Sequence, residues 1–172
     1  MENVNKSMGR LLFLICALLG GNPATAQCNV VEKVLPDGTM YYHAETLLFY
    51  KTKDFQLSGN LVTDKEHYFL SLKPLPFPEK SKNIKIKSDL VITLTNNTAY
   101  TLKLFDTYYY DKDSSFAAVY MFDAKNLPDF RTHEVKEVKL DLGEGFNNYI
   151  FRLHKEALRE QLDCFKNTKN KF

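Results

Sequence analysis

The sequence lacks the closely spaced residues that usually mark an active site or a metal centre. Its four histidines, His43, His67, His133 and His154, stand apart, with no His-x-His or His-x3-His pair and no Cys-x2-Cys pair. This spacing gives no support for a zinc site. No Gly-x-Ser-x-Gly motif for a nucleophilic serine and no glycine-rich phosphate loop is present. We therefore predict no cofactor and lean toward a protein that is not an enzyme.

The sequence also lacks a strong net charge and a long apolar run. Its 23 basic and 21 acidic residues give a formal charge of +2, so the charge offers no argument for a nucleic-acid partner. The apolar run from Leu11 to Leu19 is about half of the ~20 residues that a membrane span needs. We predict no transmembrane segment.

Residues 1–26 have the pattern of a secretory signal peptide. Lys6 and Arg10 precede the apolar run, and residues 20–23, Gly-Gly-Asn-Pro, break it. Ala24 and Ala26 are the small residues expected at the −3 and −1 positions of a cleavage site. The pattern predicts export, with residues 27–165 forming one β-rich domain and residues 166–172 a disordered tail.

Two cysteines, Cys28 and Cys164, remain after the leader. In an oxidising compartment they form a candidate disulfide, which would close most of the chain into one loop. The alternatives are two free thiols, or a lipid anchor on Cys28. Gln27 disfavours the anchor, because a lipoprotein signal has a small residue at that position.

Strand patterns dominate the rest of the chain, most clearly over residues 89–122. β-branched and aromatic residues alternate there and are interrupted by Asn, Asp and Ser clusters, as in consecutive antiparallel strands. Similar segments recur from Val30 to Leu153, with turns every eight to twelve residues. The pattern predicts a mainly β fold, an antiparallel sandwich or partly open barrel of about eight or nine short strands.

Four local features can be predicted in more detail. Matching the large apolar residues of the hairpin at 89–105 pairs Leu94 with Tyr100 and centres its loop on Asn97. Residues 40–50 form one strand that is covered on both faces for part of its length. The prolines of segment 74–78 end a strand, since proline cannot donate to a ladder. Segment 123–130 forms one helical turn, closed by Leu127 and Pro128.

The lysines of segment 79–88 have two readings. They either guard an edge strand against pairing with another chain or form a patch for phosphate or lipid headgroups.

The C-terminal segment changes to a helical period. Leu158, Leu162 and Phe165 follow one another at intervals of four and three residues, so they share one face of an amphipathic helix. We expect this face to pack on the sheet.

Aromatic density supplies the candidate binding residues, Tyr41, Tyr108 and Tyr110. Exposed tyrosines give rigid contact area for a protein or a glycan, although tyrosines also complete β cores. Adjacent side chains on a strand point to opposite faces, so Tyr109 should face away from Tyr108 and Tyr110. Asp111 and Asp113 are a weak calcium candidate, because the glycine and glutamate of a calcium loop are missing.

The leader end Ala24–Gln27, the strands Val138–Leu142 and Tyr149–Leu153, and the closing Leu162–Phe165 resemble small exported β-rich proteins of Gram-negative bacteria. The resemblance implies a periplasmic or extracellular location and brings no functional residues with it. The function that follows is a non-catalytic exported module, recognising a protein, glycan or envelope component through an aromatic sheet face or loop rim. A small periplasmic hydrolase with a convergent Asp/Glu/His site is the alternative.

Overall fold

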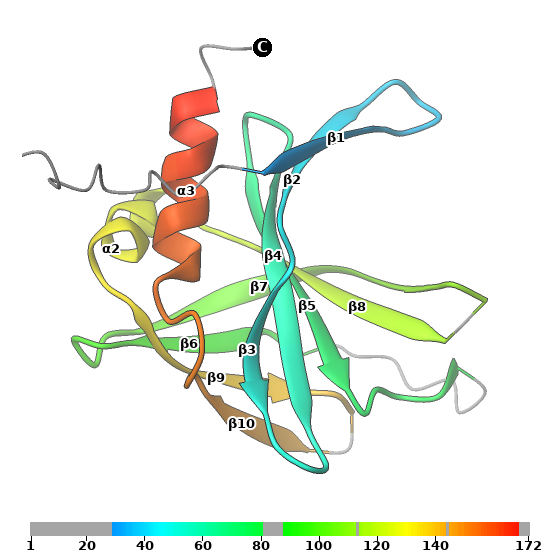
Figure 1. Cartoon of the computed structure of the whole chain (residues 1–172), viewed down its shortest axis with the longest axis vertical. Coiled ribbons are helices and arrows are strands. Elements are labelled where there is room, and N and C mark those ends of the chain that lie inside the picture. Colours follow the sequence, from blue (N-terminus) through cyan, green and yellow to red (C-terminus); the bar gives the residue numbers. More distant parts are fainter. Residues whose placement is uncertain (1–28, 81–87, 113, 144, 169–172) are drawn as a thin grey trace, which may run out of the picture.

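The computed structural model describes residues 29–80, 88–112, 114–143 and 145–168 (Figure 1). The predicted signal peptide and Cys28 lie outside these ranges, as do residues 81–87 of the lysine-rich segment. The strands are β1 Val30–Val34, β2 Met40–Ala44, β3 Leu47–Lys51, β4 Gln56–Thr63, β5 Tyr68–Leu75, β6 Leu90–Leu94, β7 Ala99–Tyr110, β8 Ser115–Met121, β9 Val135–Asp141 and β10 Phe146–Ile150; the helices are the 3-10 turn η3 Ala124–Asn126, α2 Leu127–Thr132 and α3 Ala157–Thr168.

The predicted fold class is confirmed: the protein is mainly β, all its strand pairs are antiparallel, and a helix follows the last strand. Ten strands occur among the described residues, where eight or nine were expected. They form one continuous sheet in the order β1-β2-β4-β5-β8-β7-β6-β9-β10, with β3 also paired to β4. The sheet does not close into a barrel.

The long strand β7 divides this sheet into two parts. Its first residues pair with β6, and from Lys103 onward it pairs with β8. A register shift at Phe105 interrupts the β7–β8 ladder, and such bulges bend a strand and sharpen its twist. We call the part from β1 to the β8 side of β7 sheet A, and the part containing β6, β9 and β10 sheet B.

Sheets A and B enclose a common core and approach each other again at their far ends. The backbone N–H groups of Arg152 and Leu153, just after β10, each donate to the carbonyl oxygen of Phe49 in β3 at 3.3 Å. The Phe49 and Phe151 rings stack with centroids 4.6 Å apart. This arrangement is a sandwich that nearly closes along one side.

The predicted amphipathic helix is confirmed as α3. Leu158, Leu162 and Phe165 are at most 3 % exposed and join the core formed by both sheets. The helix extends to Thr168, three residues into the segment predicted to be disordered, and residues 169–172 lie outside the described ranges.

The prediction of a single strand over residues 40–50 is wrong, because Glu45 and Thr46 interrupt it and separate β2 from β3. β2 and β3 both pair with the longer β4, at different stretches of it. Gln161 of α3 fills the break. Its side-chain oxygen accepts from the N–H of Leu61 at 2.7 Å, and its nitrogen donates to the carbonyl of Glu45 at 2.9 Å. The break puts Phe49, rather than Leu48, in the core.

The predicted hairpin register is also wrong. Tyr100 pairs with Ile92 rather than with Leu94, so the loop is Thr95 to Asn97 and is centred on Asn96. The reason lies in the turn: Asn97 has a φ of 64°, and a three-residue hairpin loop places its left-handed residue last. The error is two positions, so the predicted faces of both strands are correct.

The prolines of segment 74–78 end a strand, as predicted, because β5 stops at Leu75. Pro74 still pairs with β4, and β8 pairs only with residues 69–72, so the missing N–H of Pro74 interrupts no ladder with β8. The predicted closure of a helical turn by Leu127 and Pro128 is wrong. α2 begins at Leu127, and Pro128 lies in its first turn, where a proline loses no hydrogen bond.

The role of Gln161 can be tested directly. Gln161→Leu leaves the Leu61 N–H and the Glu45 carbonyl without their partner, at a cost of about 1–3 kcal/mol for each buried group. We expect urea unfolding to show a loss of about 2–4 kcal/mol. The control is Glu160→Leu on the exposed side of α3, which should change stability by less than about 0.5 kcal/mol. Equal losses in the two variants would contradict the bridging role.

Candidate functional site

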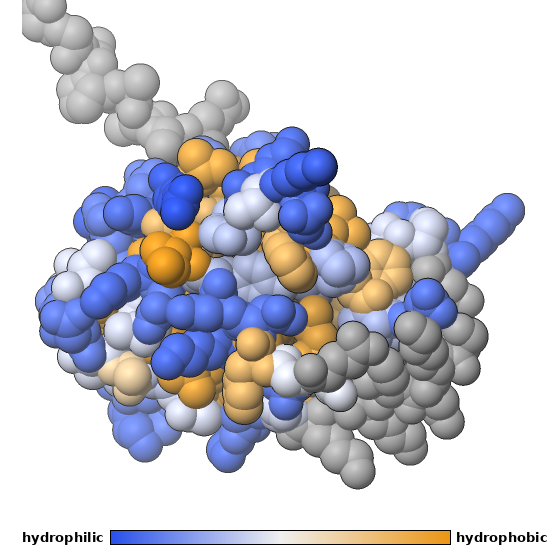
Figure 2. Space-filling view, turned by 90° about the horizontal axis from the view of Figure 1, so that it is seen from below, coloured by the Kyte–Doolittle hydropathy of each residue, from blue (hydrophilic) through white to orange (hydrophobic). Residues whose placement is uncertain are grey.

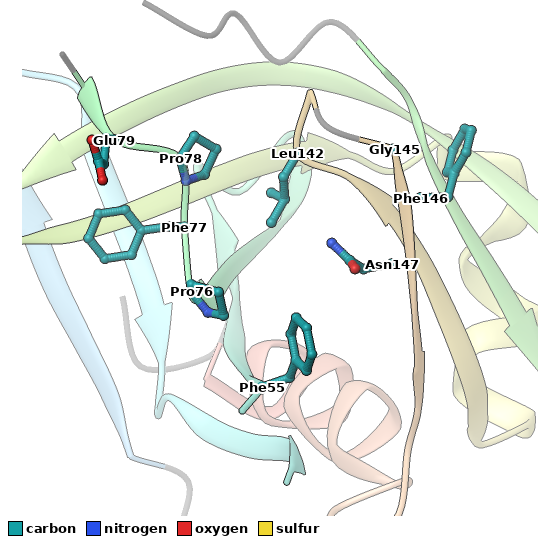
Figure 3. Close-up of a pocket in the computed structure, with 9 residues that line it drawn as sticks. All are labelled: Phe55, Pro76, Phe77, Pro78, Glu79, Leu142, Gly145, Phe146 and Asn147. Carbon is teal, nitrogen blue, oxygen red and sulfur yellow. The ribbon is translucent and has the colours of Figure 1, made fainter. Parts of the chain in front are cut away.

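Two hollows are open on the described surface. The first, the end pocket, has a volume of about 490 Å³ and lies between the chain after β5 and the β9–β10 hairpin (Figure 3). Leu142 and Asn147 point into it, and Glu79 is the one titratable residue among the described residues that line it. Figure 2 shows hydrophobic side chains scattered among hydrophilic ones on the lower face of the molecule. The described lining of the end pocket therefore offers apolar and polar contacts and a single carboxylate.

The second hollow, the outer groove, lies on the face of sheet A that turns away from the core. Its volume is about 400 Å³. The β1–β2 hairpin and the β7–β8 hairpin project on the same side of the molecule and flank the groove (Figure 1). Its lining comes from β1, β2, β4, β5, β7 and β8 and the residue after β1: Lys33, Leu35, Tyr41, His43, Val62, Phe69, Phe105, Asp106, Tyr108 and Val119.

Strand alternation explains why aromatic residues reach this face. Tyr109 points inward, where its ring packs on Phe116 at 5.0 Å and its hydroxyl donates to the carbonyl of Pro78 at 2.8 Å. Tyr108 and Tyr110 point outward, with their rings 6.0 Å apart. The opposite orientation predicted for Tyr109 is thus confirmed.

The groove has a buried floor and an exposed aromatic wall. Phe69 is 3 % exposed and forms a small apolar cluster with Val62 and Val119, against which Tyr41 packs. The Phe69 ring lies 4.8 Å from the ring of Phe105, which is 56 % exposed. Tyr108, also in the wall, is 41 % exposed. The wall thus exposes large apolar side chains to water. The floor beside it, formed by Phe69, Val62 and Val119, can contact an apolar group of a ligand.

The charged groups of the groove are unevenly placed. Burial, together with the positive charges of Lys33 and Lys73, lowers the pKa of His43 to about 4, so its imidazole is neutral at pH 7. Burial and the charge of Lys33 also lower the pKa of Lys73. The Lys73 ammonium lies 5.7 Å from the centre of the Tyr110 ring and donates to the Thr46 hydroxyl at 3.3 Å. Asp106, the only acidic lining residue, belongs to the opposite, β7 wall.

The structure places the three candidate tyrosines on this one face. Tyr41 and Tyr108 line the groove, and Tyr110 lies beside it, next to Tyr108. Sequence reasoning missed Phe69 and Phe105. Phe105 stands at the bulge of β7, where the alternation shifts, and no sequence pattern marked that position.

The remaining candidates are placed as follows. Asp111 lies in the β7–β8 turn with a φ of 51°, Asp113 is outside the described residues, and no three potential metal ligands gather among the residues that are described. Cys164 is disulfide-bonded. Cys28 and Cys16 both lie outside the described ranges, so the Cys28–Cys164 pairing stays a prediction. No helix in the described chain is long and apolar enough to cross a membrane.

The described histidines do not converge on a catalytic arrangement. His67 lies 3.0 Å from the carboxylate of Asp64, but its side chain is 54 % exposed on a turn outside both hollows. His154 lies 3.9 Å from Glu156, and both side chains are exposed by a third or more. His133 contacts Thr132 and the backbone of Asp129. These contacts give the hydrolase alternative no support among the described residues, and it stays a prediction.

No protein-family model, curated protein or solved structure matches this chain. The resemblance to exported proteins of Gram-negative bacteria stays a prediction, and the function must be argued from the outer groove itself.

The neutral state of His43 gives a prediction about pH. Its pKa is about 4 in the folded protein and near 6.5 in the unfolded chain, so the unfolded state binds more protons between these values. The contribution of His43 to the free energy of unfolding is therefore fully present above pH 6.5 and is lost as the pH falls toward 4. Because the side chain is half-exposed, solvent screens the effect, and we expect a loss of about 1 kcal/mol.

The comparison of wild type with His43→Gln isolates this contribution. Urea unfolding at pH 7 and pH 4 should show a smaller loss for the variant than for the wild type. NMR titration of the wild type should place the imidazole pKa well below 6.5. An ordinary pKa with identical pH profiles would contradict the placement of His43 beside two lysines.

Proposed function

We propose that this protein is a non-catalytic, exported binding module that takes an apolar group of its partner into the outer groove. One observation supports this most strongly: the exposed aromatic wall of Phe105 and Tyr108 beside the buried ring of Phe69. Monomeric proteins seldom leave such a cluster uncovered without a binding role. The leader pattern and the disulfide-bonded Cys164 support an oxidising location outside the cytoplasm.

The lining chemistry favours one kind of partner over others. Possible partners for an exported aromatic surface are proteins, glycans and envelope components. A glycan needs several hydrogen-bonding side chains around an aromatic platform, whereas the outer groove is mainly aliphatic and aromatic, with its charged residues at opposite walls. An apolar component of the envelope, or an apolar side chain of a protein, fits this lining better.

The proposal can be tested with an uncharged apolar fluorophore, N-phenyl-1-naphthylamine. Phe105→Ser combined with Tyr108→Ser removes the wall, and we expect the affinity for the fluorophore to fall at least tenfold, because most of the apolar contact is lost. Both residues are exposed, so folding should be preserved. Fluorescence titration measures the affinity.

The matched control is Phe55→Ser combined with Phe146→Ser. These exposed phenylalanines line the end pocket instead. The control pair should leave the affinity within about twofold of the wild type. If the control pair abolished binding and the groove pair did not, the outer groove would not be the binding site.

A further inference from the structure

The charges around the outer groove are arranged for a particular class of ligand. Lys33 lines the groove from β1 and is exposed, and Lys73 reaches the same region from β5. Within the described residues neither lysine belongs to an ion pair, although Asp111 acts on Lys73 at a distance. The neutral His43 between their charges carries one N–H donor. This end of the groove is positively charged. Among the described residues, no carboxylate accepts a hydrogen bond from the His43 N–H there.

The rest of the groove is apolar and long. From His43 on β2 it crosses β4, β5 and β8 to Phe105 on β7. Four spacings between neighbouring strands correspond to about 19 Å along a flat sheet, and the sheet's twist shortens this span. The volume of about 400 Å³ falls within the range of small-molecule sites. An elongated apolar body fits this shape better than a compact one.

Asp106 limits the orientation of such a ligand. Its carboxylate accepts the N–H of Thr107 at 2.7 Å and is exposed on the β7 wall. A negative group at that wall would be repelled. A single negative charge is best placed at the other wall, beside Lys33 and His43.

Resting on the proposed function, we propose that the outer groove binds a free single-chain amphipathic carboxylate. Its carboxylate lies at the β1–β2 wall, against the Lys33 ammonium and the His43 N–H. Its chain lies across Phe69 toward Phe105 and Tyr108. The ligand enters from the open face of sheet A and makes no covalent bond.

Displacement of N-phenyl-1-naphthylamine by two ligands that differ in one group tests this assignment. Dodecanoate and 1-dodecanol have the same chain, but only dodecanoate is charged at pH 7.5. Below its micelle concentration and at low salt, dodecanoate should bind about tenfold more tightly than dodecanol, because it gains one charge-assisted hydrogen bond. It should therefore displace the fluorophore at about one tenth of the dodecanol concentration. High salt should reduce the difference, since Lys33 is exposed to solvent.

Variants of Lys33 test whether this residue causes the preference for dodecanoate over dodecanol. Lys33→Gln should lower the affinity for dodecanoate to that for dodecanol. Lys33→Arg should keep the preference for dodecanoate. The control Lys53→Gln changes another exposed lysine that does not line the groove, and it should leave the preference intact. Lys53→Gln should also leave binding of the uncharged fluorophore unchanged. For the Lys33 variants, dodecanoate and dodecanol are compared within each variant, so that a change in fluorophore affinity affects both ligands equally.

The outcomes separate this inference from the proposed function. If the fluorophore binds and is lost in the Phe105/Tyr108 double variant, but dodecanoate and dodecanol displace it equally, the carboxylate assignment is overturned and the binding module stands. A preference that survives Lys33→Gln also overturns it. If the fluorophore does not bind the wild type at all, the proposed function fails first.

Discussion

The structure depends on a mismatch in sheet A, which has large apolar side chains on both faces but is covered on one. Sheet B and α3 pack on the inner face, where Tyr109 and Phe116 belong to the core. The outer face holds Phe69, Phe105 and Tyr108 in a groove that the described chain leaves open. Burial of apolar surface is the main favourable term in folding, so an uncovered aromatic cluster forgoes stability that a partner can supply. The proposed binding role follows from that difference between the two faces.

Two irregularities adapt the sheet to this arrangement. The register shift at Phe105 lets β7 leave sheet B and continue in sheet A, and it also turns the Phe105 ring onto Phe69. The break at Glu45 lets the chain pair with two stretches of β4, and Gln161 satisfies the backbone groups that the break exposes. Bulges and breaks of this kind interrupt a ladder at a cost, and here they form the groove and close the core.

Sequence reasoning recovered what depends on local periodicity. The fold class, the face of α3 and the orientation of Tyr109 opposite to Tyr108 and Tyr110 follow from side-chain spacing alone, and each is confirmed. The hairpin register failed because turn geometry at Asn97 outweighed the matching of apolar residues. Tyr41 and Tyr108 of the groove were predicted as binding residues from the sequence. Phe69 was not, because it lies beside them only through the pairing of β4, β5 and β8. The charges of Lys33 and Lys73 act on His43 from strands that are distant in sequence, so no local pattern reveals them.

The central claim is that sheet A presents one packed and one open aromatic face, and solvent exposure of individual rings tests it most directly. Paramagnetic relaxation of ring protons by a neutral, water-soluble gadolinium chelate measures that exposure in the unliganded protein. The account predicts strong relaxation for Phe105 and Tyr108 and weak relaxation for Phe116 and Tyr120, which are 56, 41, 3 and 0 % exposed. Equal protection of all four rings would contradict it, because the outer face would then be covered.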